Sequence, residues 1–366
     1  MAEVRLSEVN KVYQGRGQQV HAVRDLDLVV EDGEFVSIVG PSGCGKSTTL
    51  RIIVGLEKAT TGQILFNGDM VNDLDPQERN VAMAFENYAL YPNFSAEENI
   101  GFPLEARGIP KPERRRRVRE LAGLLQIENI LHQHPNTLSG GQKQRVSLAR
   151  ALIREPAAFI LDEVLGHVDG HLRFQMLFDL KRLHQSLDST MIFVTHDQME
   201  AIALSDRIAV LHQGRLVQSG TRDELYDTPA TRFVADFIGE PPTNFFDARF
   251  VEEEGEGMLR AADLALRPTV ETAARLRSRD DQRCVVGIRP QNLLCTPRAG
   301  TISFDATIDI HEYLGERSIL TLRRGGHRIQ ALASAEDSWA PDEPITLHYR
   351  PEDIMVFDAE SEALIA

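Results

Sequence analysis

The fold is decided by the stretch Gly40-Pro41-Ser42-Gly43-Cys44-Gly45-Lys46-Ser47-Thr48. It follows the apolar run Phe35-Val36-Ser37-Ile38-Val39, which is typical of a buried parallel strand. Apolar residues in helical spacing come next, from Leu50 to Val54, and Gly55 supplies the expected helix end. Between a strand and a helix, the spacing G-x-x-x-x-G-K-S turns backbone N–H groups toward an anion at the positive end of the helix dipole. The stretch therefore indicates a phosphate-binding loop.

The residue types in this loop predict distinct contacts with a nucleotide. Lys46 is expected to reach the β- and γ-phosphates, and the hydroxyl of Ser47 to ligate Mg²⁺. The loop residues expected to bind the nucleotide are Ser42, Gly43, Cys44, Gly45, Lys46, Ser47 and Thr48. The alternative is a glycine-rich turn that binds nothing, which the presence of strand, loop and helix together disfavours.

Length and composition limit the class of protein. A chain of 366 residues is expected to form two or three domains, and its 42% hydrophobic and 26% charged residues are typical of a soluble globular protein. We find no apolar stretch long enough to span a bilayer and no signal-peptide pattern. Cys44, Cys284 and Cys295 lack metal-ligand spacing and suit a reducing compartment. Because the net charge of −15 argues against broad binding to nucleic acid or anionic lipid, we expect a cytosolic protein that reaches membranes through a partner.

Tyr13 is a candidate for contact with a nucleotide base. The first segment, from Val4 to Leu28, alternates apolar and polar residues, as antiparallel strands do, and Tyr13 is expected in the connection between them. An exposed aromatic ring near a phosphate loop offers a flat face to adenine. Ordinary packing within the hairpin explains the residue equally well, so both interpretations stay open.

Two further apolar runs end in candidate catalytic side chains. Ala158-Phe159-Ile160-Leu161 is followed by Asp162 and Glu163, which a parallel sheet places at the edge where the phosphate loop opens. Asp162 is expected to hold Mg²⁺ through its water shell and Glu163 to polarise a hydrolytic water, although solvated strand-end acids are common. The other run ends at His196, either a sensor or proton partner or an ordinary satisfied histidine. Asp197 is expected to cap the next helix.

The segment from residue 95 to about 156 is expected to be helical. Within it, Leu138-Ser139-Gly140-Gly141-Gln142 opens a helix and predicts either a second anion site or a simple N-cap by Ser139. Four consecutive arginines, residues 114–117, suggest either a nucleic-acid contact or a solvated helix face. The neighbouring glutamates and the acidic composition favour the solvated face.

The pattern changes beyond Glu240-Pro241-Pro242 to short strands with glycines and prolines, and we place a linker near Pro241. One internal repeat is clear: Ile288-Arg289-Pro290-Gln291-Asn292-Leu293-Leu294 resembles Tyr349-Arg350-Pro351-Glu352-Asp353-Ile354-Met355. Repeated strand-turn units of this kind predict a small β-barrel accessory domain.

The ordered set of residues 40–48, 138–142 and 159–163 with His196 resembles the nucleotide-binding subunit of an ATP-binding cassette (ABC) transporter. The Leu-Ser-Gly-Gly-Gln signature makes this resemblance specific, since other phosphate-loop ATPases do not carry it. The Gly287-Ile288-Arg289-Pro290 motif further resembles the maltose-type carbohydrate and glycerol-phosphate importer ATPases.

The resemblance implies a fold and its division into domains. Residues 1–239 would form an α/β phosphate-loop NTPase with a RecA-like core, an antiparallel β-subdomain and a helical subdomain at about 88–156. Residues 240–366 would form an all-β OB-like regulatory domain, of the TOBE type.

The resemblance also implies ATP, Mg²⁺ and several protein partners. Two ATPase subunits would face each other head to tail, with each ATP between the phosphate loop of one and the signature of the other. The signature residues acting in trans would be Ser139, Gly140, Gly141 and Gln142. Two transmembrane permease subunits would dock on the segment 88–130 and hold the protein at the cytoplasmic face of the membrane. An extracytoplasmic solute-binding protein would act indirectly, and no nucleic acid would be involved.

Individual roles follow from the same likeness. Glu163 is similar to the general base, His196 to the γ-phosphate switch residue, and Asp169 to the aspartate of the loop that crosses the dimer. Tyr13 matches the aromatic residue that stacks on adenine. Glu86 stands where a glutamine contacts Mg²⁺ and the attacking water, so the expected metal ligands are Ser47, Asp162 and Glu86.

The sequence departs from the family pattern at three places. Glu86 replaces the glutamine, and a carboxylate cannot donate a hydrogen bond as an amide does. Val164 replaces a proline, and Gly166-His167-Val168-Asp169 replaces a segment of the type Ser-Asn-Leu-Asp. We therefore expect a competent but slow ATPase.

Two other interpretations belong to different classes. A regulatory subunit with weakened hydrolysis would dock a signalling protein through Arg289, Tyr313 and the C-terminal domain. A nucleic-acid-remodelling cassette would need a long coiled-coil insertion or a second cassette, which this sequence lacks. Sugars, disaccharides and glycerol-phosphate compounds are all possible solutes for an importer, and the sequence does not choose among them.

Overall fold

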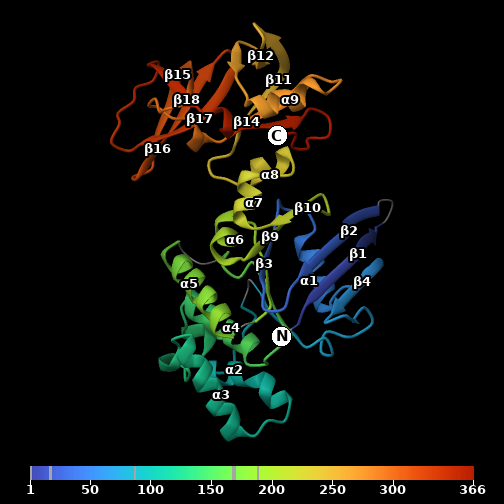
Figure 1. Ribbon diagram of the computed structural model, residues 1–366. Coiled ribbons are helices and arrows are strands. Elements are labelled where there is room, and N and C mark those ends of the chain that lie inside the picture. The colour runs from blue at the N-terminus through green and yellow to red at the C-terminus, as the bar shows by residue number, and fades with distance from the viewer. Residues whose placement is uncertain (1, 16–18, 86–87, 167–169, 188) are drawn as a thin grey trace. The chain divides into compact units, whose positions relative to one another are not determined.

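The computed structural model of the chain describes residues 2–15, 19–85, 88–166, 170–187 and 189–366. These residues divide into two compact units, Met1–Arg222 and Asp223–Ala366 (Figure 1). The domain boundary expected between residues 239 and 240 stays a prediction. None of the helices in the described ranges is long and apolar enough to cross a bilayer.

A six-stranded sheet forms the centre of the first unit. Its strand order is β10 (Arg215–Gly220), β9 (Arg207–His212), β3 (Phe35–Val39), β8 (Met191–Val194), β7 (Ala158–Asp162) and β6 (Val81–Phe85). All neighbours run parallel except β9 and β10. The prediction of buried parallel strands is confirmed for β3, whose five residues are all buried. Because the carboxyl ends of parallel strands share one edge, the segments that follow β3, β8, β7 and β6 begin along that edge.

A second sheet in this unit is antiparallel, as the alternating pattern predicts. Its order is β2 (Gln19–Val30), β1 (Val4–Gln14), β4 (Thr61–Phe66) and β5 (Asp69–Met70). The expected position of Tyr13 in the connection was wrong, because β1 runs on to Gln14 and pairs Tyr13 with Val20. A β-strand continues as long as its partner supplies hydrogen bonds, which the alternation alone does not reveal.

Among the helices of the first unit, the predicted signals at Gly55, Ser139 and Asp197 each mark a helix end. They are α1 (Lys46–Val54), α2 (Ala96–Ala106), α3 (Lys111–Leu124), α4 (Gly140–Leu152), α5 (Gly170–Leu187) and α6 (Gln198–Leu204), with the short 3₁₀ turns η1 (Glu128–Ile130) and η2 (Pro135–Thr137). Gly55 ends α1 with a left-handed φ of 83°, as expected of a helix-terminating glycine. The helical interpretation of residues 95 to about 156 is confirmed, and the next strand, β7, begins at Ala158 as expected.

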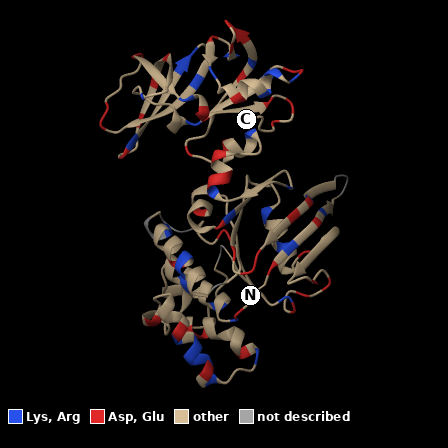
Figure 2. Cartoon of the chain, in the orientation of Figure 1, with Lys and Arg blue, Asp and Glu red and all other residues tan. Residues whose placement is uncertain are grey.

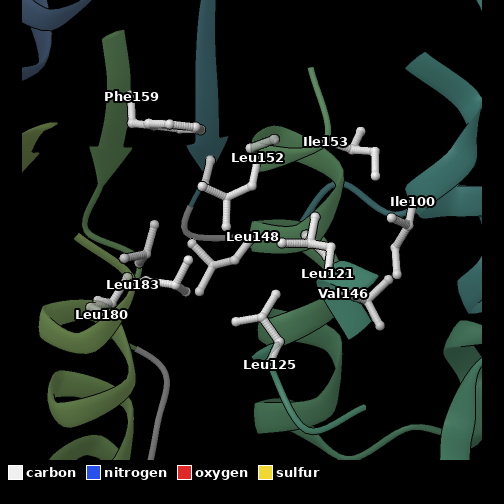
Figure 3. Close-up of a cluster of buried hydrophobic side chains, with 14 of the residues drawn as sticks. Ile100, Leu121, Leu125, Val146, Leu148, Leu152, Ile153, Phe159, Leu180 and Leu183 are labelled. Carbon is white, nitrogen blue, oxygen red and sulfur yellow. The ribbon is translucent and has the colours of Figure 1, made fainter. Parts of the chain in front are cut away.

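A buried apolar cluster packs the helices against β7. Leu148 and Leu152 of α4 lie in the middle of the cluster, with Leu183 of α5 on one side and Ile100 of α2 on the other (Figure 3). Phe159 of β7 is 2% exposed and completes the contact with the sheet. Because all five side chains are buried together, α4 packs on the same core as β7, the strand that ends at Asp162.

The four arginines of α3 form a solvated helix face. Arg114 pairs with Glu105 and Arg115 with Glu97, while both Arg116 and Arg117 pair with Glu113 of their own helix. Figure 2 shows acidic and basic residues interleaved along α3. Each arginine thus has a carboxylate partner within the protein, and the expectation of a solvated face is confirmed.

The second unit is mainly β. Two antiparallel sheets have the orders β13 (Leu264–Leu266), β12 (Glu256–Ala261), β11 (Asn244–Glu253), β14 (Arg283–Ile288), β19 (Ile354–Asp358) and β17 (His327–Ser334), β16 (Arg317–Arg324), β15 (Ile302–Tyr313), β18 (Pro344–Tyr349). One buried core joins side chains of both sheets. The helices are α7 (Arg222–Asp227), which begins at the unit boundary, α8 (Arg232–Phe237) and α9 (Val270–Arg277). The expected all-β character is confirmed for the strand-rich part of this unit.

The internal repeat folds twice into the same local structure. β14 leads through Arg289 into the 3₁₀ turn η3 (Pro290–Asn292), and β18 leads through Arg350 into η4 (Pro351–Asp353). The two arginines differ in environment, because Arg289 is 3% exposed and Arg350 is exposed. The guanidinium of Arg289 donates to the carbonyl oxygens of Ile238 and Tyr226, each at a distance of 2.6 Å. Arg289 therefore binds backbone carbonyl groups inside the protein and cannot contact a docking protein as the regulatory interpretation expects.

Candidate functional site

The phosphate loop needs glycine where its backbone passes close to other strands. Gly40 has a φ of 151°, and a Cβ atom there would lie 2.2 Å from the carbonyl oxygen of Leu211. Gly45 has a φ of 106°, and its Cβ would lie 2.4 Å from the carbonyl oxygen of Ala22. Since no other residue fits both the left-handed backbone and these approaches, the two glycines determine the path of the loop.

Lys46 lies along the inner side of its own loop. Its side chain is 5% exposed, and Nζ donates to the carbonyl oxygens of Gly40 (2.7 Å) and Pro41 (3.1 Å). Gly45 caps α1 without a side-chain hydrogen bond, so no side chain of the cap occupies the first amides of the helix. An ammonium group beside such amides is the arrangement that a phosphate group requires.

Cys44 is the buried thiol of this loop. Its Sγ lies 4.0 Å from Lys46 Nζ. Burial raises the pKa of the thiol, and the charge of Lys46 opposes that rise. Cys44 therefore acts as a packing residue of the loop, and we assign it no nucleophilic role.

A pocket of about 400 Å³ opens over the loop. Besides residues of the loop itself, it is lined by Val20, His21, Ala22 and Arg24 of β2 and by Gln213 and Gly214 of the turn between β9 and β10. The turn is held in place because Gly214 N donates to Cys44 O (3.0 Å) and Arg24 N donates to Gly214 O (2.7 Å). Sequence reasoning missed these residues, although Gln213-Gly214 is recognisable as a turn.

Tyr13 is not among the residues that line this pocket, but its strand partner Val20 is. The ammonium of Lys11 lies 4.8 Å from the centre of the Tyr13 ring. The residue thus lies on the strand next to the pocket wall, and its contact with adenine stays a prediction.

Glu163 and His196 are brought together at the shared edge of the sheet. Glu163 follows β7, and its N–H donates to the carbonyl oxygen of Val194 at the end of β8 (2.9 Å). Its Oε2 lies 3.5 Å from Nδ1 of His196, and the side chains are 28% and 60% exposed. Glu163 has a φ of 48°, a left-handed conformation that is costly for a residue with a side chain. Such strain is common at functional positions, and here it accompanies the residue expected to be the base.

The residues flanking His196 adopt the predicted local structure. Asp197 caps α6, and its Oδ1 accepts from the backbone N–H of Met199 (2.8 Å) and Glu200 (3.2 Å). The prediction of a cap at Asp197 is confirmed. Because the cap starts α6 immediately after the strand end, His196 is left in the turn between them.

Of the residues expected to hold Mg²⁺, the described ones offer a hydroxyl and a carboxylate. Ser47 lies in the first turn of α1, which follows β3, and Asp162 ends β7. Mg²⁺ prefers oxygen ligands and is usually bound by one or two carboxylates together with substrate phosphates and water. Ser47 and Asp162 fit this chemistry.

The signature segment begins α4 with a capping box. Ser139 Oγ accepts from Gln142 N (3.4 Å), and Gln142 Oε1 accepts from Ser139 N (2.9 Å). The N-cap interpretation of Ser139 is confirmed. Ser139 and Gly140 are exposed, so a further ligand has access to this end of the helix, and the expected contact in trans stays a prediction.

Two expected site residues, Glu86 and Asp169, lie outside the described residues, as do His167 and Val168. Of the other departures from the family pattern, Val164 is buried at 2% exposure. Gly166 N donates to Glu163 O (3.0 Å), which closes a turn directly after the expected base.

Comparison with known proteins identifies two family patterns in the chain. Residues 23–166 match the ABC transporter family, and residues 286–357 match the TOBE domain. The first match contains the phosphate loop, the signature segment and the Asp162–Glu163 pair. The second contains both copies of the internal repeat.

Curated relatives match the chain along most of its length. The sn-glycerol-3-phosphate import ATP-binding protein UgpC of Chromobacterium violaceum is 40% identical, over 100% of this chain and 96% of the relative. The trehalose/maltose import ATP-binding protein MalK of Thermococcus litoralis is 44% identical, over 89% of each chain. Among solved structures, the ATP-binding cassette MJ0796, a dimer bound to ADP and Pi, is 34% identical with a TM-score of 0.55 and covers 60% of this chain and 98% of its own.

Proposed function

The chain belongs to the ABC transporter family as an ATP-hydrolysing subunit coupled to import, and we propose that the solute it serves is a sugar or a glycerol-phosphate compound. The family assignment accounts for the loop at Lys46 and for the signature at Ser139. The solute class is supported by the names of the relatives that match nearly the whole chain.

The observation that carries the assignment of site residues is the contact between Glu163 and His196. The two side chains come from β7 and β8, and β8 lies between β7 and the strand that leads into the phosphate loop. A carboxylate beside an imidazole at this edge can accept a proton from water while the imidazole stabilises the terminal phosphate. We assign Glu163 as the general base and His196 as the γ-phosphate contact.

The phosphate loop binds the nucleotide and takes no part in proton transfer. Lys46 exchanges its hydrogen bonds to Gly40 and Pro41 for contacts with the β- and γ-phosphates, and the amides at the start of α1 donate to the same anion. Ser47 and Asp162 would hold Mg²⁺, which would neutralise the charge that develops on the transferred phosphate. Glu86 is the third proposed ligand.

The exposed signature implies a site shared between two subunits. The signature residues contact the γ-phosphate bound to a second copy of the chain, and Asp169 belongs to the loop that crosses between the copies. These signature residues are Ser139, Gly140, Gly141 and Gln142. The dimeric cassette MJ0796 supports this arrangement. Two transmembrane permease subunits hold the dimer at the cytoplasmic face of the membrane, and an extracytoplasmic binding protein delivers the solute to them.

Hydrolysis by purified protein tests the assignment of Glu163. Glu163→Gln is expected to bind ATP, to form a dimer that persists in ATP and Mg²⁺, and to lose at least about 100-fold in turnover. Lys46→Ala is expected to lose ATP binding as well. Glu312→Gln, an exposed position of β15 outside the site, is the matched control. Wild-type turnover in Glu163→Gln would disprove the assignment.

Uptake measurements test the solute class. Deletion of the gene for this chain is expected to abolish uptake of either labelled glycerol 3-phosphate or a labelled disaccharide, and the Glu163→Gln variant should not restore it. Unchanged uptake of both classes would contradict the proposed solute while leaving ATP hydrolysis unaffected.

A further inference from the structure

The turn that carries His196 contains a buried hydrogen-bond network. Thr195 Oγ1 donates to Glu200 Oε2 at a distance of 2.6 Å, and the backbone N–H of Asp197 donates to Thr195 Oγ1 at 3.0 Å. Thr195 is 1% exposed and Glu200 is 3% exposed. The residues before and after His196 are thus tied to one buried carboxylate at the start of α6.

Arg173 of α5 reaches both acidic side chains of this turn. Its Nη1 lies 3.3 Å from Asp197 Oδ2, and its Nε lies 3.7 Å from Glu200 Oε1. The guanidinium is a planar fork with several donors, so one side chain can hold two carboxylates at a defined separation. Arg173 therefore links α5 to both acids of the α6 start.

His196 depends on this network for its position. Its side chain is 60% exposed, so packing around the ring contributes little to its orientation. The backbone on either side is instead held by Thr195, which bonds to Glu200, and by Asp197, which caps α6. A change in the turn would move the imidazole relative to Glu163.

We propose that Arg173 is a positioning residue for ATP hydrolysis, which acts by holding Asp197 and Glu200 and thereby the backbone on which His196 meets the γ-phosphate. The proposal rests on the proposed role of His196. It assigns Arg173 no contact with ATP.

The electrostatics of Glu200 explain why an arginine is needed there. Burial raises the pKa of the Glu200 carboxyl, and Asp197 acts in the same direction, while Thr195, Arg173 and His196 oppose the rise. Removal of Arg173 leaves a buried carboxylate and the nearby Asp197 without this cation. A buried acid that loses its partner either takes up a proton or moves toward water, and both responses disturb the Thr195 hydrogen bond.

Substitution of Arg173 tests the proposal on the full chain. Arg173→Met is expected to lower the turnover number for ATP by about tenfold to 100-fold, because a displacement of about 1 Å at a reacting group has effects of this size. The dissociation constant for ATP should change by less than about twofold, since the residue does not touch the nucleotide. Backbone amides of residues 197–200 should exchange with deuterium faster than in the wild type.

Matched variants separate positioning from general damage. Arg182→Met, at an exposed position of α5, the helix that also carries Arg173, should leave turnover and exchange unchanged. Arg173→Lys should retain part of the turnover, because it keeps the charge without the fork. Glu200→Gln should have a smaller effect than Arg173→Met, since Gln still accepts from Thr195. If Arg173→Met does not fold, Arg173→Lys and Glu200→Gln still decide the question through turnover and amide exchange.

Failure of this inference is distinguishable from failure of the proposed role of His196. If His196→Ala keeps wild-type turnover, the role of His196 is wrong. If His196→Ala is impaired but Arg173→Met keeps wild-type turnover and amide exchange, the positioning role is wrong. If Arg173→Met lowers the residual turnover of His196→Ala by the same factor as in the wild type, Arg173 acts independently of His196, which also overturns the inference.

Discussion

The guanidinium carbon of Arg289 lies 3.8 Å from the centre of the Tyr226 ring, and the same guanidinium donates to the carbonyl oxygen of Tyr226. Another of its nitrogens donates to Ile238 O at the end of α8. The arginine is thus the common partner of the segments that contain α7 and α8. The carboxyl end of a helix carries a partial negative charge, so a cation there is favourable. The guanidinium of Arg289 lies at such an end and is buried as well.

Arg289→Met is expected to lower the free energy of unfolding of the second unit by about 2 kcal/mol, because buried carbonyl groups lose their donor. The single tryptophan, Trp339, lies in the same unit and reports urea unfolding by fluorescence. Arg350→Met is the control, since Arg350 occupies the same position of the second repeat but is exposed, and it should change stability by less than about 0.5 kcal/mol. Equal effects of the two substitutions would show that burial of Arg289 is irrelevant.

Arg79 caps the far end of the phosphate-loop helix. Its Nη1 donates to Ile52 O (2.7 Å) and Ile53 O (2.9 Å), and the residue is 4% exposed. Arg79→Met should cost about 2 kcal/mol of stability by leaving these carbonyls unpaired, and should weaken ATP binding because α1 begins at the loop. Thermal unfolding with and without ATP measures both effects. Arg51→Met, an exposed arginine in the last turn of the same helix, should change neither.

Glu86→Gln is expected to raise ATP turnover severalfold. A carboxylate about 4 Å from a phosphate charge, at an effective dielectric near 20, adds roughly 4 kcal/mol of repulsion wherever Mg²⁺ does not offset it. The amide removes this charge and can donate a hydrogen bond. Release of phosphate by purified protein in Mg²⁺ measures the rate, with Glu163→Gln as the inactive reference. A slower Glu86→Gln enzyme would mean that the carboxylate serves the reaction. If the wild type hydrolyses no ATP and only Glu86→Gln does, the carboxylate disables this site.

Asp358 makes the stability of the second unit dependent on acid. Its Oδ1 accepts from Ser361 N (2.7 Å), Ser361 Oγ (2.8 Å) and Glu360 N (3.0 Å), and these bonds, with help from Arg279, hold the pKa of the carboxyl well below its usual range. A lowered pKa in the folded state stabilises the fold above the pKa of the unfolded chain, about 3.9 for aspartate. This contribution is lost as the pH falls below that value toward the folded pKa.

Asp358→Asn should therefore be less stable than the wild type at pH 7 and pH 5, and the difference should shrink at pH 3. Urea unfolding followed by Trp339 fluorescence at the three pH values measures it. Asp309→Asn, at an exposed position of β15, is the control. A difference that stays constant down to pH 3 would show that the charge of Asp358 does not contribute.

Local signals in the sequence were sufficient where the contacts themselves are local. The cap at Asp197, the end of α1 at Gly55 and the capping box at Ser139 each join residues at most a few positions apart. The solvated face of α3 was likewise interpretable, because Glu113, one helical turn away, supplies the charge partner of Arg116 and Arg117. Local hydrogen bonds depend on neighbouring residue types, which the sequence states directly.

Residues far apart in the sequence required the folded chain. Arg79 caps a helix that ended more than twenty residues earlier, and no motif marks it for that role. Arg289 and Arg350 occur in equivalent repeats, and only the packing of α7 and α8 on one copy buries the first. The pocket lining from β2 and from Gly214 was missed for the same reason, since strand order decides which turns meet the loop.

By itself, the sequence of residues 35–55 determined a strand, a loop and a helix, because only glycine tolerates the backbone at Gly40 and Gly45 and only this spacing leaves the helix amides open to an anion. Tertiary structure decided which side chains meet at the ends of the strands beside the phosphate loop. It placed Glu163 against His196 and Arg173 against the turn that carries His196. The order of parallel strands is set by packing of the whole core, and periodicity along one strand contains no information about which strand lies next to it.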